Sequence, residues 1–144
     1  MRIHEVLKGK DARLVTCKPE DAVGTVADLM TAHKIGALPV RDEEGRLIGM
    51  LSERDVAQGF ARYGEILSRK TVRTLMSSPV ITCRLEDEVR SAMVTMSRQR
   101  IRHLPVVEGE ALVGVVSQGD LMARLLEQSE LENAVLRDRV IALR

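Results

Sequence analysis

The sequence predicts an α/β (α+β) protein made of two copies of one strand-helix-strand-strand-helix unit. Pro105 lies 66 residues after Pro39, and the same offset relates Cys17 to Cys83. A register that is kept along a whole repeat indicates an internal duplication. The fold class therefore follows from the repeat and from the elements that each copy encodes.

In each copy, an apolar-Pro-Val strand is followed by a Gly-bearing strand and then by Ser-x-x-Asp. These residues are Ser52 and Asp55 in the first copy and Ser117 and Asp120 in the second, where the offset is 65 because one turn is shorter. Each copy has only about 60 residues, which is too few to bury a comfortable core alone. We therefore expect the two copies to pair about a pseudo-twofold axis and to form one module.

In the first copy, segments whose apolar residues have helix or strand spacing are separated by residues that favour turns. Pro19 and Asp21 favour the start of a helix, Gly36 favours its end, and an acidic turn separates two strands of a hairpin. The predicted elements are a helix over 3–7, a strand over 13–17, a helix between Pro19 and Gly36, a hairpin of 37–41 and 46–51, and a helix from Ser52 to Tyr63 closed by Gly64. Residues 65–70 are expected to be a link.

The second copy repeats this order, and its last helix is longer. The predicted elements are a helix over 72–76, a strand over 80–84, a helix over 87–100, a hairpin of 103–107 and 112–117, and a helix from about Gln118 toward the C-terminus. The expected division is residues 1–68 for the first repeat with its N-terminal helix, 69–126 for the second repeat, and 127–144 for a helical extension.

Bulk properties exclude several classes of protein. The 144 residues include 22 basic and 21 acidic ones, so no basic excess suggests a nucleic acid partner. No apolar run has the length of a membrane span, and the start lacks the apolar core of a signal peptide. We therefore expect a cytoplasmic protein with no nucleic acid and no membrane partner.

Cysteine and histidine predict no redox or metal site. Cys17 and Cys83 occupy the same repeat position, so they are either a disulfide or, as we favour, two buried residues of the first strands. The three histidines, His4, His33 and His103, have no metal-ligand spacing. No metal site is expected.

The repeated motifs resemble the cystathionine-β-synthase (CBS) domain, and two in tandem resemble a Bateman module. The resemblance covers residues 13–125 approximately, and both copies carry the whole pattern. It implies paired βαββα repeats, a regulatory module that binds an adenosine-containing nucleotide in clefts between the repeats, and a homodimer. AMP, ADP, ATP, a nicotinamide dinucleotide and S-adenosylmethionine share the adenosyl group, and the sequence does not separate them.

An enzyme is not expected. The sequence has neither G-x-x-x-x-G-K-[ST] nor G-x-G-x-x-G, and it has no serine elbow. Enzymes of the inosine-monophosphate dehydrogenase type carry a similar module inside a barrel of about 250 residues, which this chain cannot hold. No catalytic residue and no required cofactor are therefore assigned.

The Ser-x-x-Asp group has two interpretations. A serine at a helix N-cap with an acid three residues later resembles a capping box. The same aspartate could instead accept hydrogen bonds from both hydroxyls of a ribose, with the serine and the helix-start amides beside a phosphate. The CBS resemblance assigns the ribose to this aspartate, so we favour the ligand role for Asp55 and Asp120.

With one Phe, one Tyr and no Trp, a base would have to lie among aliphatic side chains. The candidates for this slot are Val15, Ile35, Leu38 and Met50 in the first copy and Ile81, Ile101, Leu104 and Val115 in the second, although a plain core role fits most of them. Pro39 and Pro105 suggest an edge strand, and such an edge would leave the backbone of residues 36–38 and 102–104 free to contact the base.

The two copies differ where phosphates would bind. The first has Gly36-Ala37 and Arg54, and the second has Arg102-His103 with Gly119 in place of Arg54. Basic residues before Leu-Pro resemble phosphate-contacting positions in nucleotide-sensing CBS proteins, whereas a solvated surface charge is the alternative. The full set of candidate ligand residues is Thr16, Ile35, Gly36, Ala37, Leu38, Pro39, Ser52, Arg54, Asp55, Thr82, Ile101, Arg102, His103, Leu104, Pro105, Ser117 and Asp120.

The last helix is longer than the repeat needs, because no Pro or Gly interrupts residues 121–144. A heptad seam with a polar centre runs along it: Met122, Leu126, Ser129, Asn133, Leu136, Val140 and Leu143. We expect a homodimer in which this helix serves self-association or docking of an effector protein, although a solvated single helix is the alternative. The alternative function for the whole chain is a dimerisation module of the same fold with vestigial pockets.

Overall fold

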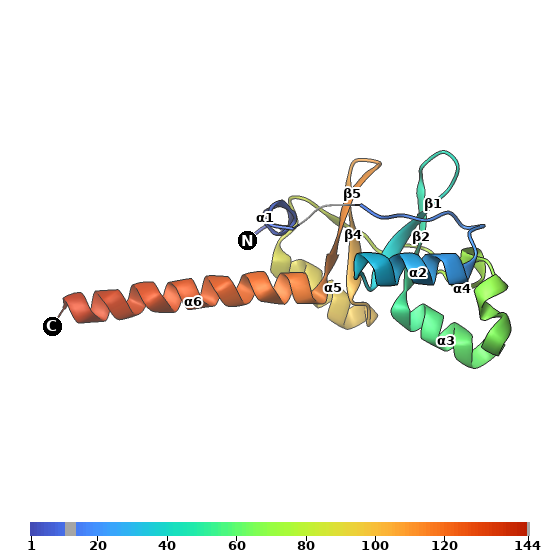
Figure 1. Cartoon of the computed structure of the whole chain (residues 1–144). Coiled ribbons are helices and arrows are strands. Elements are labelled where there is room, and N and C mark those ends of the chain that lie inside the picture. The colour runs from blue at the N-terminus through green and yellow to red at the C-terminus, as the bar shows by residue number, and fades with distance from the viewer. Residues whose placement is uncertain (11–13, 144) are drawn as a thin grey trace.

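A computed structural model describes residues 1–10 and 14–143 of the chain (Figure 1). Its elements, in chain order, are α1 (Ile3–Lys8), α2 (Val23–His33), β1 (Ala37–Arg41), β2 (Leu47–Ser52), α3 (Glu53–Tyr63), the 3₁₀-helix η1 (Gly64–Arg69), α4 (Val72–Leu75), β3 (Cys83–Arg84), α5 (Val89–Gln99), β4 (His103–Glu108), β5 (Ala111–Ser117) and α6 (Gln118–Ala142). This order confirms the predicted mixed fold with two similar halves.

Each half is built on one antiparallel hairpin. β1 pairs with β2, and β4 pairs with β5, and both ladders shift register at one point. In the second half, β3 adds a parallel strand beside β4. In the first half, the predicted strand over 13–17 is reduced to a single parallel bridge between Cys17 and Val40, and its first residue, Arg13, lies outside the described residues.

The proline strands are not edges, so that prediction was wrong. β4 lies between β3 and β5, and in the first half the Cys17 backbone N–H donates to the Pro39 carbonyl while the Arg41 N–H donates to the Cys17 carbonyl. Each proline stands where pairing with the first strand begins. The N–H that proline lacks is therefore not needed by the ladder.

The short helices α1 and α4 are exchanged between the halves. The Ile3 N–H donates to the Asp87 carbonyl of the second half, and the Val72 N–H donates to the Asp21 carbonyl of the first, both at 2.9 Å. Two glycines make room for the crossing side chains: a Cβ at Gly114 would lie 2.9 Å from Leu7, and one at Gly49 would lie 2.6 Å from Met76. The helix preceding each repeat in the sequence thus packs on the other repeat in space.

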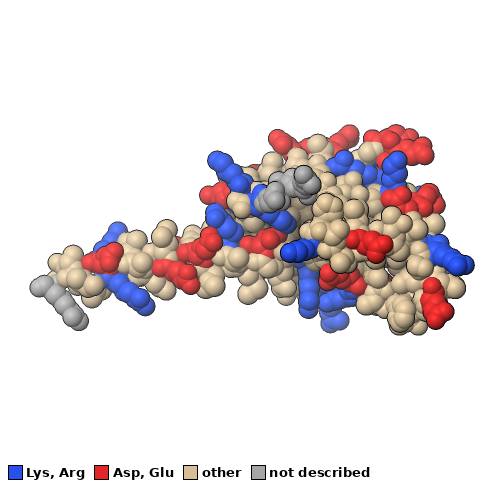
Figure 2. Space-filling view, viewed as in Figure 1, with Lys and Arg blue, Asp and Glu red and all other residues tan. Residues whose placement is uncertain are grey.

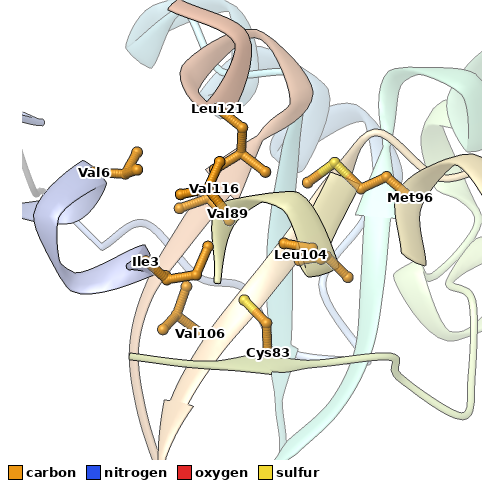
Figure 3. Packing of buried hydrophobic residues seen from close by; sticks show 10 residues of the cluster. Ile3, Val6, Cys83, Val89, Met96, Leu104, Val106, Val116 and Leu121 are labelled. Carbon is orange, nitrogen blue, oxygen red and sulfur yellow. The ribbon is translucent and has the colours of Figure 1, made fainter. Parts of the chain in front are cut away.

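Each half has its own apolar core. The core of the second half joins side chains from α1, α5, α6 and the β4–β5 hairpin around Leu104, Val116 and Leu121 (Figure 3). The core of the first half includes Leu38, Leu51 and, from α4, Val72. Both cysteines are free thiols within these cores, and burial, reinforced by a nearby aspartate, raises the pKa of each to about 12. The buried-strand interpretation of the cysteines is confirmed.

Two local expectations were wrong. The helix that Gly36 was expected to end stops earlier, because Lys34 adopts a left-handed conformation and its N–H closes the last turn. Arg100 does the same at the end of α5. Residues 65–70, expected to be a link, instead form most of η1, which packs against α2 and α3.

The helix α6 extends far past the rest of the molecule (Figure 1). Its first turns pack on the second core through Leu121, which is fully buried, and Leu125. From residue 126 to 143 every residue is exposed. Among the described residues, no helix combines the length and the apolar character needed to cross a bilayer.

Candidate functional site

Two cavities lie where the two halves meet. We call them the Asp120 cavity, of about 260 Å³, and the Asp55 cavity, of about 330 Å³. Their sizes lie around the lower limit of small-molecule sites in proteins. The described residues that line the Asp120 cavity are Leu7, Lys10, Leu14, Val15, Lys34, Ile35, Gly36, Ala37, His103, Val113, Gly114, Val115, Ser117 and Asp120. Those that line the Asp55 cavity are Gly36, Ala37, Met50, Ser52, Glu53, Arg54, Asp55, Ser77, Pro79, Val80, Ile81, Arg100, Ile101, Arg102 and His103.

Each cavity combines the two copies in a crossed manner. The Asp120 cavity takes Ser-x-x-Asp, Val113 and Val115 from the second copy, whereas Val15 and Ile35 come from the first. In the Asp55 cavity, Met50 belongs to the same copy as Asp55, and Ile81 and Ile101 come from the second copy. Six of the eight aliphatic candidates for the base slot line one of the two cavities, and each cavity takes candidates from both copies.

Six of the predicted ligand residues are not among the described lining residues. Leu38 and Leu104 are fully buried in the two cores, so for them the plain core role applies. Pro39 and Pro105 are also buried within their strands. Thr16 and Thr82 stand one residue after the lining residues Val15 and Ile81.

The Ser-x-x-Asp groups form the capping boxes that the spacing indicates. The Asp55 N–H donates to Ser52 Oγ at 3.2 Å, and the Ser52 N–H donates to Asp55 Oδ2 at 2.9 Å. Ser117 and Asp120 make the same pair of bonds at the start of α6. In both boxes one carboxylate oxygen, Oδ2, accepts the capping bond, so a second oxygen is left for another donor. Capping and ligand binding are therefore compatible roles for the same aspartate.

The sequence analysis did not predict a role for Lys10, whose positive charge makes the Asp120 cavity chemically different from the Asp55 cavity. The Lys10 ammonium lies 2.7 Å from Asp120 Oδ2 and donates a second bond to the Val115 carbonyl at 2.8 Å. Burial alone would raise the pKa of Asp120, but the bonds from Lys10 and Ser117 outweigh it and hold that pKa below its usual value. The N-terminal position of Lys10 gave no motif by which to find it.

Lys10→Met should make the protein less stable at neutral pH, and the deficit should shrink in acid. Because the folded-state pKa of Asp120 is lowered, its stabilisation is complete above the unfolded pKa of about 4 and is lost as pH falls through the folded value. Melting temperatures of wild type and variant, measured from pH 7 to pH 3, check this. Lys18→Met is the matched control, since Lys18 is exposed. A deficit that stays constant down to pH 3 would instead assign Lys10 a packing role.

The Asp55 cavity has a basic rim. Arg54 and Arg102, both predicted, are joined there by Arg100, and all three are exposed. Arg54 reaches across from α3, and its Nη1 donates to the Arg100 carbonyl at 3.3 Å. The sequence analysis did not predict a role for Arg100. The repeat could have indicated one, because Arg100 corresponds to Lys34, a basic residue that lines the other cavity.

His103 lies between the cavities and lines both. Burial, together with Lys10 and Arg102, lowers its pKa against the opposing effect of Asp120 and Glu53. The imidazole is therefore uncharged at neutral pH and offers a hydrogen bond rather than a positive charge. A Cβ at Gly36 would lie 3.2 Å from this ring, so a glycine allows the close approach of His103.

Part of the backbone that was expected to be free is already bonded. The Gly36 carbonyl accepts a bond from the Glu53 N–H at 2.9 Å, and the Arg102 carbonyl accepts one from the Gln118 N–H at 2.8 Å. These bonds attach the first residue of α3 and of α6 to the strand beside it. For these two carbonyls the prediction of unoccupied groups was wrong, because each serves a helix start.

The sequence of the chain matches one family model, that of the CBS domain. It matches residues 10–62 and again residues 72–127. The chain belongs to the CBS-domain family. Both copies are covered, so it is a tandem CBS pair, that is, a Bateman module.

Relatives of this CBS pair are found among curated and solved proteins. The mitochondrial CBS domain-containing protein CBSX3 of Arabidopsis thaliana is 31% identical over 134 residues, which cover 88% of this chain and 65% of the plant protein. The chain thus spans slightly less than two thirds of that relative. A crystal structure of a CBS-domain-containing protein from Agrobacterium tumefaciens matches with a TM-score of 0.81 and 32% identity, covering 85% of this chain and 91% of that one.

One similar structure contains ligands. It is the CBS domain pair of protein MJ0100 in complex with 5′-methylthioadenosine and S-adenosyl-L-methionine. The TM-score is 0.77 at 25% identity, and the match covers 90% of this chain and 98% of that chain. A related pair of the same fold therefore binds adenosine-containing molecules.

Proposed function

We propose that this CBS pair is a non-enzymatic regulatory module that binds an adenosine-containing nucleotide and signals its occupancy to a partner protein. The observation that carries the proposal is the Asp55 cavity, where a carboxylate with an oxygen left over from capping faces a rim of three arginines. The adenosyl ligands of the MJ0100 pair support the same ligand class.

In the Asp55 cavity each part of a nucleotide meets a suitable group. Asp55 accepts hydrogen bonds from the ribose hydroxyls, and the aliphatic side chains of Ile81 and Ile101 flank the base. Arg54 and Arg102 attract the phosphates, and guanidinium groups suit phosphate because they donate parallel hydrogen bonds. AMP, ADP, ATP and a nicotinamide dinucleotide fit the whole description, whereas S-adenosylmethionine has no phosphate and shares only the adenosyl part.

We propose that the Asp120 cavity is the weaker of two unequal sites. Lys10 lies 2.7 Å from the same Oδ2 of Asp120 that accepts the capping bond, so the charge of this carboxylate is already balanced by an ammonium and its Oδ1 attracts a ribose hydroxyl less strongly. Counted from the equivalent first residues of α1 and α4, Ile3 and Val72, the position that corresponds to Lys10 is Pro79, which carries no charge. Asp55 is consequently the more accessible acceptor.

The competing function is a CBS-fold dimerisation module with vestigial pockets, which the Lys10–Asp120 ion pair and the exposed α6 favour. Mass spectrometry of the natively purified protein separates the two functions by identifying any small molecule that stays bound. Co-purification of an adenosyl compound supports the sensor. If no nucleotide co-purifies and none raises the melting temperature at millimolar concentration, the dimerisation module is correct.

Arg102→Ala should weaken binding of a nucleotide more than binding of adenosine. The missing guanidinium acts on the phosphate, and because Arg102 is exposed its effect should be screened by salt. Calorimetric titrations of AMP and adenosine at low and high ionic strength check both points. Arg90→Ala, an exposed arginine on α5 that does not line the Asp55 cavity, is the control. Equal weakening of both ligands would remove the phosphate role.

We also propose that the protein is a homodimer, as the sequence suggested. The large exposed apolar side chains of α6 support this. A homodimer would also place two regulatory modules side by side, where an effector protein could contact both.

A further inference from the structure

The outer part of α6 has an apolar surface that its own chain does not cover. Leu136 and Val140 are 57% and 56% exposed, and Leu126 is 61% exposed. They belong to the seam defined above, which repeats with the alternating steps of three and four residues that two-stranded coiled coils use. This segment stands clear of the rest of the molecule (Figure 1), so a second helix has room beside it.

The charges beside the seam suit a second copy of the same helix. With Asn133 at heptad position a, the flanking e and g positions hold Glu130 and Glu132 in one turn and Arg137 and Arg139 in the next. None of these four forms an ion pair within residues 1–10 and 14–143. On the face shown in Figure 2, the middle of the protruding helix carries acidic side chains, and basic side chains lie nearer the tip together with an acidic one. The helix is therefore complementary to itself.

The polar centre of the seam decides the orientation. In a parallel, in-register pair, Asn133 faces Asn133 of the second copy and their amides can bond to each other, while Glu132 reaches Arg137 of the second copy. An antiparallel pair would form more exposed ion pairs but would set Asn133 against Leu136. An unpaired buried amide costs more than a solvent-exposed ion pair contributes. The parallel arrangement is therefore favoured.

We propose that α6 joins two copies of this protein in a parallel two-stranded coiled coil whose register is fixed by Asn133. Val140 at position a and Leu136 at position d are the residue types that favour two strands in this orientation. The interface requires no nucleotide and does not rest on the proposed ligand. It leaves the opposite side of the helix, including Leu131, in solvent.

Two leucines provide a matched test of the seam. Leu136→Ala should weaken the dimer by roughly tenfold or more, because it removes apolar contact from both helices. Leu131→Ala, a substitution of the same kind at a 71% exposed leucine off the seam, should leave the dimer constant unchanged. Sedimentation equilibrium of the full chain measures both. A monomeric wild type, an unchanged constant in Leu136→Ala, or equal losses in both variants would overturn the proposal.

A cysteine at the polar centre tests the orientation. Under oxidising conditions, Ser129→Cys should give a covalent dimer on a non-reducing gel, because a parallel register sets position 129 against itself. The buried native cysteines make wild type a suitable blank. If Ser129→Cys stays uncrosslinked while Ser129→Cys with Val140→Cys crosslinks, the helices are antiparallel and the proposed register is wrong.

Truncation after Glu127 tests whether the two copies associate through the outer part of α6 or through the rest of the molecule. The shortened protein keeps Leu121 and Leu125, which pack on the second core, so it should fold and bind nucleotide as before. Its dimer constant should fall by at least as much as that of Leu136→Ala. A truncated protein that dimerises like wild type would show that the two copies meet elsewhere.

Discussion

Asp55→Ala should weaken nucleotide binding in the Asp55 cavity by one to two orders of magnitude. The variant loses a charged acceptor for the ribose hydroxyls, and such a hydrogen bond contributes about 1.5–3 kcal/mol. Folding should suffer less, because losing the capping role of the side chain costs about 1 kcal/mol. Asp120→Ala should remove binding only in the Asp120 cavity. Calorimetric titration and thermal melting of both variants measure the two effects separately.

Asp55→Asn is the control that keeps the cap. An asparagine oxygen can still accept the Ser52 N–H, so this variant should melt close to wild type while binding the nucleotide less tightly. A different result for the two alanine variants would contradict the proposed ribose contact. If both alanine variants bind like wild type and melt much lower, the two aspartates are caps and nothing more.

Leu104→Ala should destabilise the protein by about 2–5 kcal/mol, the range for removing most of a buried leucine from a packed core. Leu104 is fully buried among the side chains of the second core (Figure 3), although the sequence made it a candidate for the base slot. Urea unfolding should show the loss, and nucleotide affinity at temperatures where the variant is folded should be unchanged. Leu131→Ala, on the exposed helix, is the control and should shift stability by less than about 0.5 kcal/mol.

The result that would contradict this is a reversal of the two effects. If Leu104→Ala weakened the nucleotide strongly and left the unfolding midpoint unchanged, Leu104 would contact the base. The same comparison applies to Leu38, which is fully buried at the corresponding place in the first core.

Local structure was predicted well at the hairpins and at the helix starts that a capping box marks. The strand Ala37–Arg41 and the helix starts at Ser52 and Ser117 were placed to the residue, because hairpin turns and capping boxes depend on neighbours in the sequence. The duplication doubled each of these signals.

What sequence reasoning missed depends on contacts between distant residues. The ion pair of Lys10 with Asp120 joins residues 110 positions apart, and nothing in the sequence around Lys10 indicates its partner. The exchange of α1 and α4 and the crossed lining of the cavities are of the same kind. A periodic pattern shows which face of an element is buried, but it does not show which copy covers that face.

Asp120 belongs to the wall of a cavity and to the first turn of α6. A molecule that contacts this carboxylate therefore acts at the base of the helix proposed to join two copies. Thermodynamic linkage makes any such coupling reciprocal: if the ligand changes the association constant by some factor, association changes the affinity for the ligand by the same factor. The affinity of the protein for its ligand then depends on the protein concentration. Titrations performed well below and well above the dimer constant should give ligand affinities that differ by that factor.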